Sequence, residues 1–462
     1  MKKSRLLSVL LCLALLSGLL ATFASAADSG SAILDEMDVN AKAAVLVDPD
    51  TGEILYEKNA HAHNYPASIT KVMTCLLTLE AVDRGELSLE QTVTASSALH
   101  TGIGEGASTA DIKEGEQIRI IDLLYAALIP SANEACNVMA EAVSGDVASF
   151  VELMNTRAAE LGMEDTHFSN THGYHDDDHY TSAYDIYLMC REAMKHETFR
   201  TIVRSPSYTL PATNLQPERT IFSSNGFLTG FYAGQGYTYG KAIGIKTGYT
   251  GEAGRCLASA AVDEQGRTFY CVVLGTEDDP ETKSKRSFTE SKRLLEWAFD
   301  NFQHITLLDQ DTENVMREVP VTLSDEADYV QAIPKGEIQA TVPSDFDIKQ
   351  AKLDIVLPDS IEAPVTAGDK LGTITLEYNG VEYGTLDMVA MDSVDRSEFL
   401  YTIQQVEYYW DQWWVKALAA VGAVLVVALI VFVTVVLPKR KARRRYSRAG
   451  GGRRSGNYRG RR

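Results

Sequence analysis

The feature that most constrains this chain is an apolar run near its C-terminus, Ala417–Leu437, which contains no charged residue. A helical stretch of roughly 20 such residues matches the thickness of the hydrocarbon core of a membrane. Aromatic residues (Tyr408–Trp414) precede the run, and six basic residues follow it between Lys439 and Arg445, as expected at the outer interface and on the cytoplasmic side. We therefore predict an aromatic juxtamembrane segment (401–416), one transmembrane helix (417–437) and a basic cytoplasmic tail (438–462).

The N-terminus carries a second apolar run of a different kind. It has a basic start, an apolar stretch from Leu6 to Leu20, and Ala24 and Ala26 at the spacing that signal peptidases accept. We interpret residues 1–26 as an export signal that is removed. The residues between this signal and the membrane helix are then expected outside the cytoplasm.

The formal net charge of −20 hides an uneven distribution. The tail contains twelve basic residues and the signal three, and neither contains an acidic residue. The exported part is therefore more acidic than the whole chain, which argues against nucleic acid as a partner and suits solubility outside a cell. The tail could bind nucleic acid or anionic lipid, but its position directly after a membrane helix favours the topological interpretation.

The exported part is long enough for two or three domains, and its pattern changes near Gln303. Before this point helices and strands alternate, with a hairpin over residues 44–57 and a closing helix over 288–302. After it, short strands follow one another, and Asn379-Gly380 is typical of a hairpin turn. We predict an α/β (α+β) domain over residues 27–303 and a small β-sandwich-like domain over residues 304–400.

Five cysteines remain after removal of the signal, and they lie on apolar stretches without metal-ligand spacing. Cys256 and Cys271 flank a predicted hairpin turn, so one disulfide bridge between them is conceivable. Buried free thiols are the alternative, which the odd number of cysteines favours.

A serine and a lysine stand three residues apart in the segment Tyr65–Thr74, at the start of a predicted helix. Positions i and i+3 of a helix share one face, so Ser68 and Lys71 would lie side by side. A serine becomes a good nucleophile when a base takes its proton, and burial or a second cation lowers the pKa of a lysine enough for that role. The spacing alone is weak, because a serine that caps a helix and a solvated lysine would produce the same pattern.

Two further motifs strengthen the catalytic interpretation. Ser131-Ala132-Asn133 lies between two predicted helices, after a break at Pro130, so its polar side chains can project into a cleft. Lys246-Thr247-Gly248 follows apolar residues and is typical of an edge strand that offers its backbone to an extended peptide. S-x-x-K, S-x-N and K-T-G in this order occur together in penicillin-binding proteins and class A β-lactamases.

On these motifs, the chain resembles the serine D-alanyl-D-alanine carboxypeptidases among the low-molecular-mass penicillin-binding proteins. The resemblance includes AAVLVDPDTGEILYEKNA and GIKTGYTGEAGRCLASA, covers about residues 41–302, and continues into the family's second domain. It implies a β-lactamase/transpeptidase-like fold for the first domain. The family's usual S-G-N is S-A-N here, which restricts the turn slightly. The predicted transmembrane anchor also departs from those members that lie on the membrane through an amphipathic helix.

The resemblance implies catalytic roles for the motif residues. Ser68 would be the acylated nucleophile, Lys71 its general base, and Ser131 a relay of protons toward the leaving amine. Lys246 would also lower the pKa of Lys71 as a nearby like charge. The backbone N–H groups of Ser68 and Tyr249 would form the oxyanion hole.

The same resemblance implies a set of substrate-binding residues. Asn133 would bind the substrate amide, and Lys246 with Thr247 would hold the terminal carboxylate beside Gly248. Arg286 could contribute to this carboxylate pocket, although an arginine near the closing helix is more often a surface residue.

A loop rich in histidine and aspartate, His172–His179, resembles a metal site at first sight. Its spacing fits no standard ligand pattern, so we predict neither a metal nor another cofactor.

Together these inferences predict a membrane-anchored D-alanyl-D-alanine carboxypeptidase. It would remove the terminal D-Ala from peptidoglycan stem pentapeptides through a serine acyl-enzyme in cell-wall maturation, and β-lactam antibiotics would inhibit it covalently. A β-lactamase is one alternative, but class A enzymes use an added glutamate, and no E-x-x-L-N segment lies between Asn133 and Lys246. A catalytically idle cell-wall scaffolding protein is another, against which the intact motifs argue.

Overall fold

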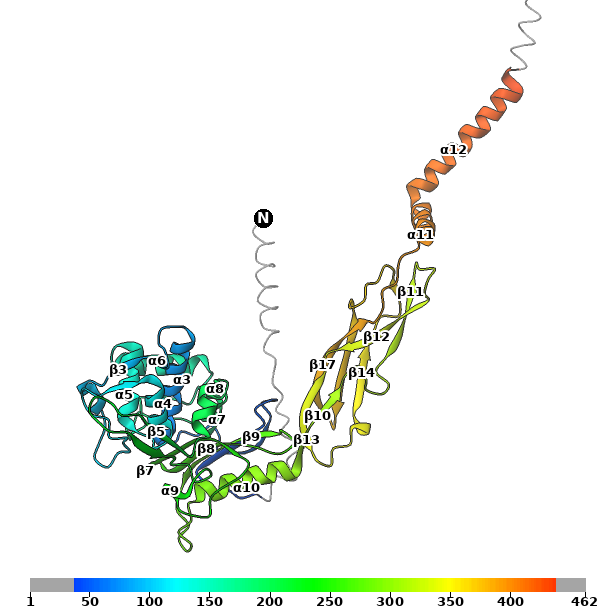
Figure 1. Cartoon of the computed structure of the whole chain (residues 1–462). Helices are drawn as coiled ribbons and strands as arrows, with labels where there is room; N and C mark the ends of the chain where they lie inside the picture. Colours follow the sequence, from blue (N-terminus) through cyan, green and yellow to red (C-terminus); the bar gives the residue numbers. More distant parts are fainter. Residues whose placement is uncertain (1–36, 438–462) are drawn as a thin grey trace, which may run out of the picture. The chain divides into compact units, whose positions relative to one another are not determined.

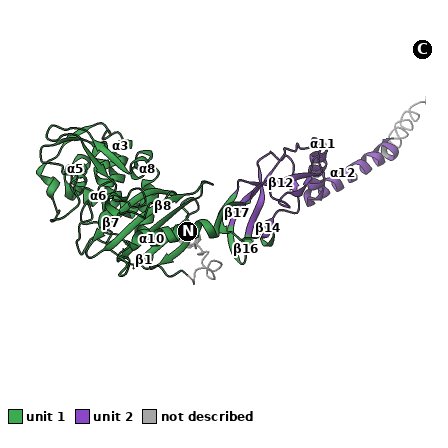
Figure 2. Ribbon diagram, turned by 60° about the horizontal axis from the view of Figure 1, so that its bottom comes forward, with its two compact units in different colours: residues 1–307, 338–351, 377–383 green, residues 308–337, 352–376, 384–462 purple. Residues whose placement is uncertain are grey.

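A computed structural model of the chain describes residues 37–437, so the predicted signal and basic tail lie outside the described residues. The described residues form two compact units (Figure 2). The first unit contains residues up to 307 together with 338–351 and 377–383, and the second contains the remainder. The residues of the three sequence motifs lie in the first unit.

A five-stranded antiparallel sheet is the centre of the first unit (Figure 1). Its strand order is β2-β1-β9-β8-β7, and neighbouring strands pair antiparallel throughout. The strands are β1 (Ala43–Val47), β2 (Ile54–Lys58), β7 (Ala242–Thr250), β8 (Gly254–Val262) and β9 (Thr268–Thr276). The predicted hairpin over residues 44–57 is confirmed, and β7, which carries Lys246-Thr247-Gly248, lies at an edge of the sheet as predicted.

Alternate residues of the central strands point into two separate cores. Val45 and Val47 belong to one hydrophobic cluster, whereas Ala44 and Leu46 belong to the other, as the two-residue repeat of a strand requires. The predicted closing helix, α10 (Arg286–Asn301), packs on β8 and β9 through the second cluster.

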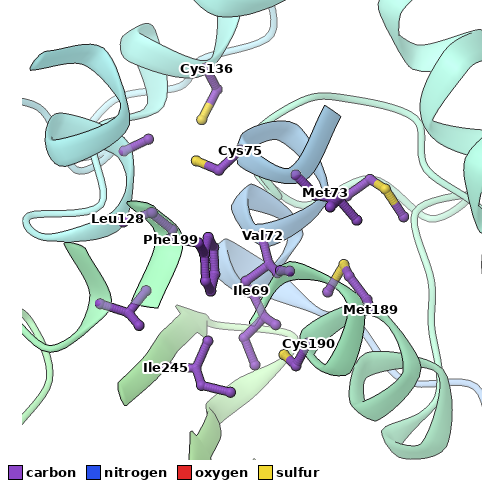
Figure 3. Packing of buried hydrophobic residues seen from close by; sticks show 14 of the residues in the cluster. Ile69, Val72, Met73, Cys75, Leu128, Cys136, Met189, Cys190, Phe199 and Ile245 are labelled. Carbon is purple, nitrogen blue, oxygen red and sulfur yellow. The ribbon is translucent and has the colours of Figure 1, made fainter. Parts of the chain in front are cut away.

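The helices of the other layer pack around α3 and bring together parts of the chain that are distant in sequence. In Figure 3, Val72 of α3 (Lys71–Asp83) lies near Phe199 of α8 (Glu197–Val203), and the same cluster includes Cys75 of α3 and Ile245 of β7. The helices are η1 (Ala67–Thr70), α3 (Lys71–Asp83), η2 (Ser97–His100), α4 (Ile120–Leu128), α5 (Asn133–Ser144), α6 (Val147–Glu160), α7 (Ala183–Ala193) and α8 (Glu197–Val203). Short elements complete this unit: β3 (Thr92–Thr94) with β4 (Gln117–Arg119), β5 (Ser207–Leu210) with β6 (Arg219–Phe222), and α9 (Gly230–Ala233).

The conceivable disulfide between Cys256 and Cys271 does not form, and both are buried free thiols. Cys256 points into the cluster around α3, and Cys271 points into the cluster against α10. Because these clusters lie on opposite faces of the sheet, the two sulfur atoms cannot meet. The remaining cysteines of the described chain, Cys75, Cys136 and Cys190, are also buried and free.

The β-rich region that follows α10 has the predicted series of short strands. β10 (Phe302–Leu308) pairs with β13 (Ile338–Pro343), and a larger sheet has the order β14-β16-β17-β12-β11-β15. Its strands are β11 (Arg317–Thr322), β12 (Tyr329–Lys335), β14 (Lys352–Val356), β15 (Ile361–Glu362), β16 (Lys370–Tyr378) and β17 (Val381–Ala390), with η3 (Ile348–Gln350) before β14. Asn379 and Gly380 both have positive φ angles, 50° and 83°, which confirms the predicted hairpin turn.

Two helices end the described chain. Most of the predicted aromatic segment forms α11 (Glu398–Asp411), whereas its residues from Trp413 onward begin α12 (Trp413–Val431). The apolar run continues α12 and ends in a short π-helical stretch, η4 (Phe432–Val436). Residues Trp413–Val435 form one helix that is long and apolar enough to cross a membrane. Gln412 has extended backbone angles, φ −69° and ψ 129°, and separates α11 from α12.

Candidate active site

Ser68 and Lys71 lie side by side where η1 meets α3. The Lys71 Nζ donates to Ser68 Oγ at 2.8 Å and to the His172 carbonyl oxygen at 2.7 Å. Ser68 lies in a 3₁₀ turn rather than in the predicted α-helix, and residues i and i+3 eclipse one another in that geometry. The tighter turn therefore brings the hydroxyl and the amine into direct contact.

Lys71 is fully buried, and this burial lowers its pKa from 10.5 to about 8. Lys246 is also buried, and its pKa lies well below its ordinary value, first because of burial and second because of the charge of Lys71. Burial is the main cause of the lowered pKa of Lys71, and the repulsion between Lys71 and Lys246 disfavours the state in which both amines are charged. A buried lysine with a pKa near 8 is about one tenth free amine at pH 7, far more than a lysine with the ordinary pKa.

Ser131-Ala132-Asn133 forms the turn between α4 and α5, as predicted. Ser131 has a φ of 71°, in the left-handed region, and its buried Oγ has no hydrogen-bond partner among the described residues. A strained backbone and an unpaired buried hydroxyl are features that functional sites maintain. Ala132 has a φ of −59°, so alanine is accommodated here without strain in place of the family's glycine.

A buried carboxylate, that of Glu134, holds the chain beside Asn133 in place. Glu134 Oε1 accepts hydrogen bonds from Thr109 Oγ1 at 2.6 Å and from the Ala110 backbone N–H at 2.7 Å. The Asn133 backbone N–H donates to the Ser108 carbonyl oxygen at 3.0 Å. These bonds tie the loop before α4 to the start of α5.

The edge strand β7 lies on the opposite side of the site from Asn133. Thr247 Oγ1 lies 2.6 Å from Ser224 Oγ, and Lys246 Nζ donates to the Thr247 carbonyl oxygen at 3.0 Å. A Cβ atom at Gly248 would lie 2.9 Å from the Pro66 carbonyl oxygen, so only glycine lets the strand approach the turn that carries Ser68 this closely.

A cavity of about 630 Å³ lies between these two sides of the site. Its lining includes Ser68, Ser131, Asn133, Thr247, Gly248 and Tyr249, so three motifs that are distant in sequence meet in one place. Lys71 and Lys246 are buried directly behind this surface. The arrangement is suited to nucleophilic attack by the Ser68 hydroxyl on a carbonyl carbon held along β7.

Arg286 is not among the residues that line the cavity. It begins α10 and forms an ion pair with Asp279, with an N–O distance of 2.9 Å. Its neighbours Lys285 and Ser287 do line the cavity, because successive residues at the start of the helix point in different directions.

Sequence motifs did not reveal several other lining residues. Ser224, Arg255 and Lys285 reach the cavity from three separate segments. Arg255 is paired with Asp278, and its guanidinium lies over the Tyr249 ring, 4.9 Å from the centroid. Ser224 follows β6, Arg255 lies near the start of β8 and Lys285 precedes α10, so no common sequence pattern connects them.

The histidine- and aspartate-rich loop packs beneath the nucleophile. His172 and His179 are buried, and His172 supplies the carbonyl oxygen that accepts from Lys71. Within residues 37–437, no group of three or more histidine, cysteine, aspartate or glutamate side chains is arranged to hold a metal ion.

Two family models match the chain. The model described as D-alanyl-D-alanine carboxypeptidase matches residues 30–278. The model described as penicillin-binding protein 5, C-terminal domain, matches residues 302–396. The first match contains all three motifs, and the second contains most of the β-rich region.

Individual relatives agree with these models. D-alanyl-D-alanine carboxypeptidase DacF of Bacillus subtilis is 30% identical over 377 residues, covering 82% of this chain and 92% of the relative. DacA of Escherichia coli is 28% identical over 403 residues, covering 84% and 93%. The solved structure of penicillin binding protein 5 from Haemophilus influenzae superposes with a TM-score of 0.61 at 26% identity, covering 78% of this chain and 99% of that one. The chain belongs to the serine-type D-alanyl-D-alanine carboxypeptidases of the low-molecular-mass penicillin-binding protein family, and it carries the penicillin-binding protein 5 C-terminal domain.

Proposed function

We propose that this protein is a membrane-anchored carboxypeptidase that removes the terminal D-Ala from peptidoglycan stem pentapeptides and is inhibited covalently by penicillins. Family membership implies peptidoglycan peptides as substrates and β-lactams as ligands. The observation that carries the proposal is the 2.8 Å contact between the buried Lys71 amine and the Ser68 hydroxyl at the floor of the cavity.

Acylation begins when the free amine of Lys71 takes the proton from Ser68 Oγ as the oxygen attacks the carbonyl carbon of the penultimate D-Ala. The new C–O bond converts the carbonyl oxygen into an oxyanion. We expect the backbone N–H groups of Ser68 and Tyr249 to stabilise this charge; both residues line the cavity. Collapse of the tetrahedral intermediate breaks the peptide bond.

The leaving amine of the terminal D-Ala needs a proton at that moment. Ser131 Oγ has no competing hydrogen-bond partner among the described residues, so it is free to pass the proton from Lys71 to this nitrogen. The terminal carboxylate would lie against Thr247 and the cation of Lys246. Its negative charge would raise the pKa of Lys246 and keep that amine protonated. Water then hydrolyses the ester, with Lys71 again accepting a proton.

The membrane assignment depends on the composition of Trp413–Val435 and on the basic residues that follow it. A single span here would hold the catalytic unit outside the cytoplasm, where peptidoglycan peptides occur. This location suits a role in cell-wall maturation.

The direct test is release of D-Ala from a synthetic diacyl tripeptide ending in D-Ala-D-Ala by the full-length chain in detergent. We expect release by the wild type and none by Ser68→Ala. Release that persists in Ser68→Ala would exclude Ser68 as the nucleophile. Absence of release together with rapid penicillin hydrolysis would instead indicate a β-lactamase, and absence of both would indicate a non-catalytic role.

A further inference from the structure

The residue before the nucleophile has a strained backbone. Ala67 has a φ of 48°, in the left-handed region, and is buried. This conformation is unfavourable for an L-residue, so surrounding contacts must hold it in place.

A directed series of hydrogen bonds ends on the carbonyl oxygen of this residue. Thr70 Oγ1 donates to the Ala67 oxygen at 2.8 Å, and the His179 Nε2 lies 2.8 Å from Thr70 Oγ1. On its other side, His179 Nδ1 accepts from the Ser169 backbone N–H at 2.9 Å. A neutral imidazole that accepts at Nδ1 carries its proton on Nε2, so His179 donates to Thr70 and Thr70 donates to Ala67.

Burial fixes both the direction and the geometry of this series. Thr70 and His179 are almost inaccessible, and burial lowers the pKa of His179 to about 3, so the ring stays neutral. The loop that carries His179 is closed at its base by a backbone bridge between His167 and Tyr180. A Cβ atom at Gly173 would lie 1.8 Å from the Ala67 oxygen, so the loop contacts this carbonyl closely only because residue 173 is glycine.

The Ala67 carbonyl and the Ser68 N–H belong to one peptide unit, and this unit is trans. In a planar trans peptide the C=O and N–H bonds point in opposite directions, so the direction of one fixes that of the other. A hydrogen bond to the carbonyl oxygen also polarises the amide and strengthens its N–H as a donor.

We propose that His179 and Thr70 are positioning residues that orient the Ser68 N–H as an oxyanion donor through the Ala67–Ser68 peptide plane. This inference rests on the proposed function, because the oxyanion forms only if Ser68 is acylated. A purely structural role for the same bonds would change stability and leave the rate of acylation by folded protein unaltered.

The test compares Thr70→Val, which removes the hydroxyl, with Thr70→Ser, which retains it. Thr78→Val is the matched control, because Thr78 is equally buried on α3 and donates to a backbone carbonyl at the same distance, 2.8 Å, without contact to the nucleophile turn. Full-length protein in detergent is mixed with fluorescent penicillin. The rate constant of single-turnover acylation is then measured. The final amount of labelled protein gives the active fraction, so loss of folded protein lowers this amount and leaves the rate constant unchanged.

We expect Thr70→Val to lower the acylation rate constant and the kcat for the D-Ala-D-Ala peptide about 10- to 100-fold, with KM changed less than about threefold. Thr70→Ser should recover most of the rate, and His179→Phe should resemble Thr70→Val. A rate constant for Thr70→Val equal to that of Thr78→Val would overturn the proposal.

The experiment distinguishes loss of folding from loss of the positioning role, and failure of the proposed function from failure of this inference. If Thr70→Val yields no active protein, Thr70→Cys replaces it, because a thiol is a weak donor of similar size, and the same comparison with Thr78→Val applies. If penicillin does not label the wild-type protein, the proposed function itself is refuted. If the wild type is labelled but Thr70→Val and Thr78→Val have equal acylation rate constants, only the positioning role is refuted.

Discussion

The Lys71 amine is held between two acceptors, Ser68 Oγ at 2.8 Å and the His172 carbonyl oxygen at 2.7 Å. The second contact anchors the amine against the loop beneath it, so the amine faces the hydroxyl without depending on substrate. When Lys71 loses a proton, the same 2.8 Å contact allows the Ser68 hydroxyl to donate to the free amine, so base and nucleophile are in contact before a peptide enters.

The pH dependence of acylation should report the protonation of Lys71. A lysine with a pKa lowered to about 8 is mostly protonated below that pH and cannot accept the Ser68 proton. The single-turnover rate of penicillin acylation should therefore rise about tenfold per pH unit below pH 8 and level off above it. Lys71→Met should lose most of the rate and this step in the profile. A wild-type rate that does not vary between pH 6 and 9 would count against Lys71 as the base.

Gly248→Ala should move β7 away from the nucleophile turn. Its new methyl would meet the Pro66 carbonyl at 2.9 Å and the Ala67 Cβ at 3.2 Å, and neither backbone segment can move without disturbing Ser68. We expect a fall in kcat/KM of about 10- to 100-fold and a loss of roughly 1–3 kcal/mol in stability. Gly240→Ala is the control, because nothing lies within 4 Å of a Cβ there. Equal activity in both variants would show that this close approach is unimportant.

Substitutions of Ser131 should affect stability and activity differently. Its φ of 71° strains any residue with a Cβ atom, and glycine removes that strain. Ser131→Gly should therefore be more stable than Ser131→Ala by about 1 kcal/mol in urea unfolding, while both variants lose the hydroxyl and release D-Ala much more slowly. A Ser131→Ala enzyme with wild-type turnover would remove Ser131 from the proton path.

Removal of residues 413–462 should release the protein from the membrane. This deletion takes away the helix Trp413–Val435 and the basic tail, and it leaves the residues that line the cavity intact. We expect the full chain to stay in the membrane fraction after alkaline carbonate extraction and the shortened chain to become soluble with its penicillin binding retained. A full chain that carbonate extracts would argue against a spanning helix.

Short-range patterns predicted much of this molecule. The hairpin turn at Asn379-Gly380 and the turn at Ser131 each depend on a few adjacent residues, so the sequence could predict them. The edge position of Lys246-Thr247-Gly248 depends on the order of distant strands, and it was predicted from the need of an extended peptide for a free strand edge. The pairing of Ser68 with Lys71 depends on a three-residue spacing that both 3₁₀- and α-helices place on one face.

Long-range contacts could not be predicted in the same way. The 2.6 Å contact between Ser224 and Thr247 joins segments that no motif connects. Whether Cys256 and Cys271 faced each other depended on the register of β8 and β9, because a shift of one residue moves a side chain to the other face. The position of Arg286 depended on the exact start of α10, which sequence patterns locate only to within one or two residues.

Mass spectrometry of the penicillin adduct tests the central claim most directly, namely that Ser68 is acylated. Full-length protein is incubated with benzylpenicillin, digested, and the modified peptide is sequenced. We predict one adduct per chain, located on Ser68 in the peptide that contains Ser68 and Lys71, and no adduct in Ser68→Ala. An adduct on another residue, or undiminished labelling of Ser68→Ala, would contradict the account.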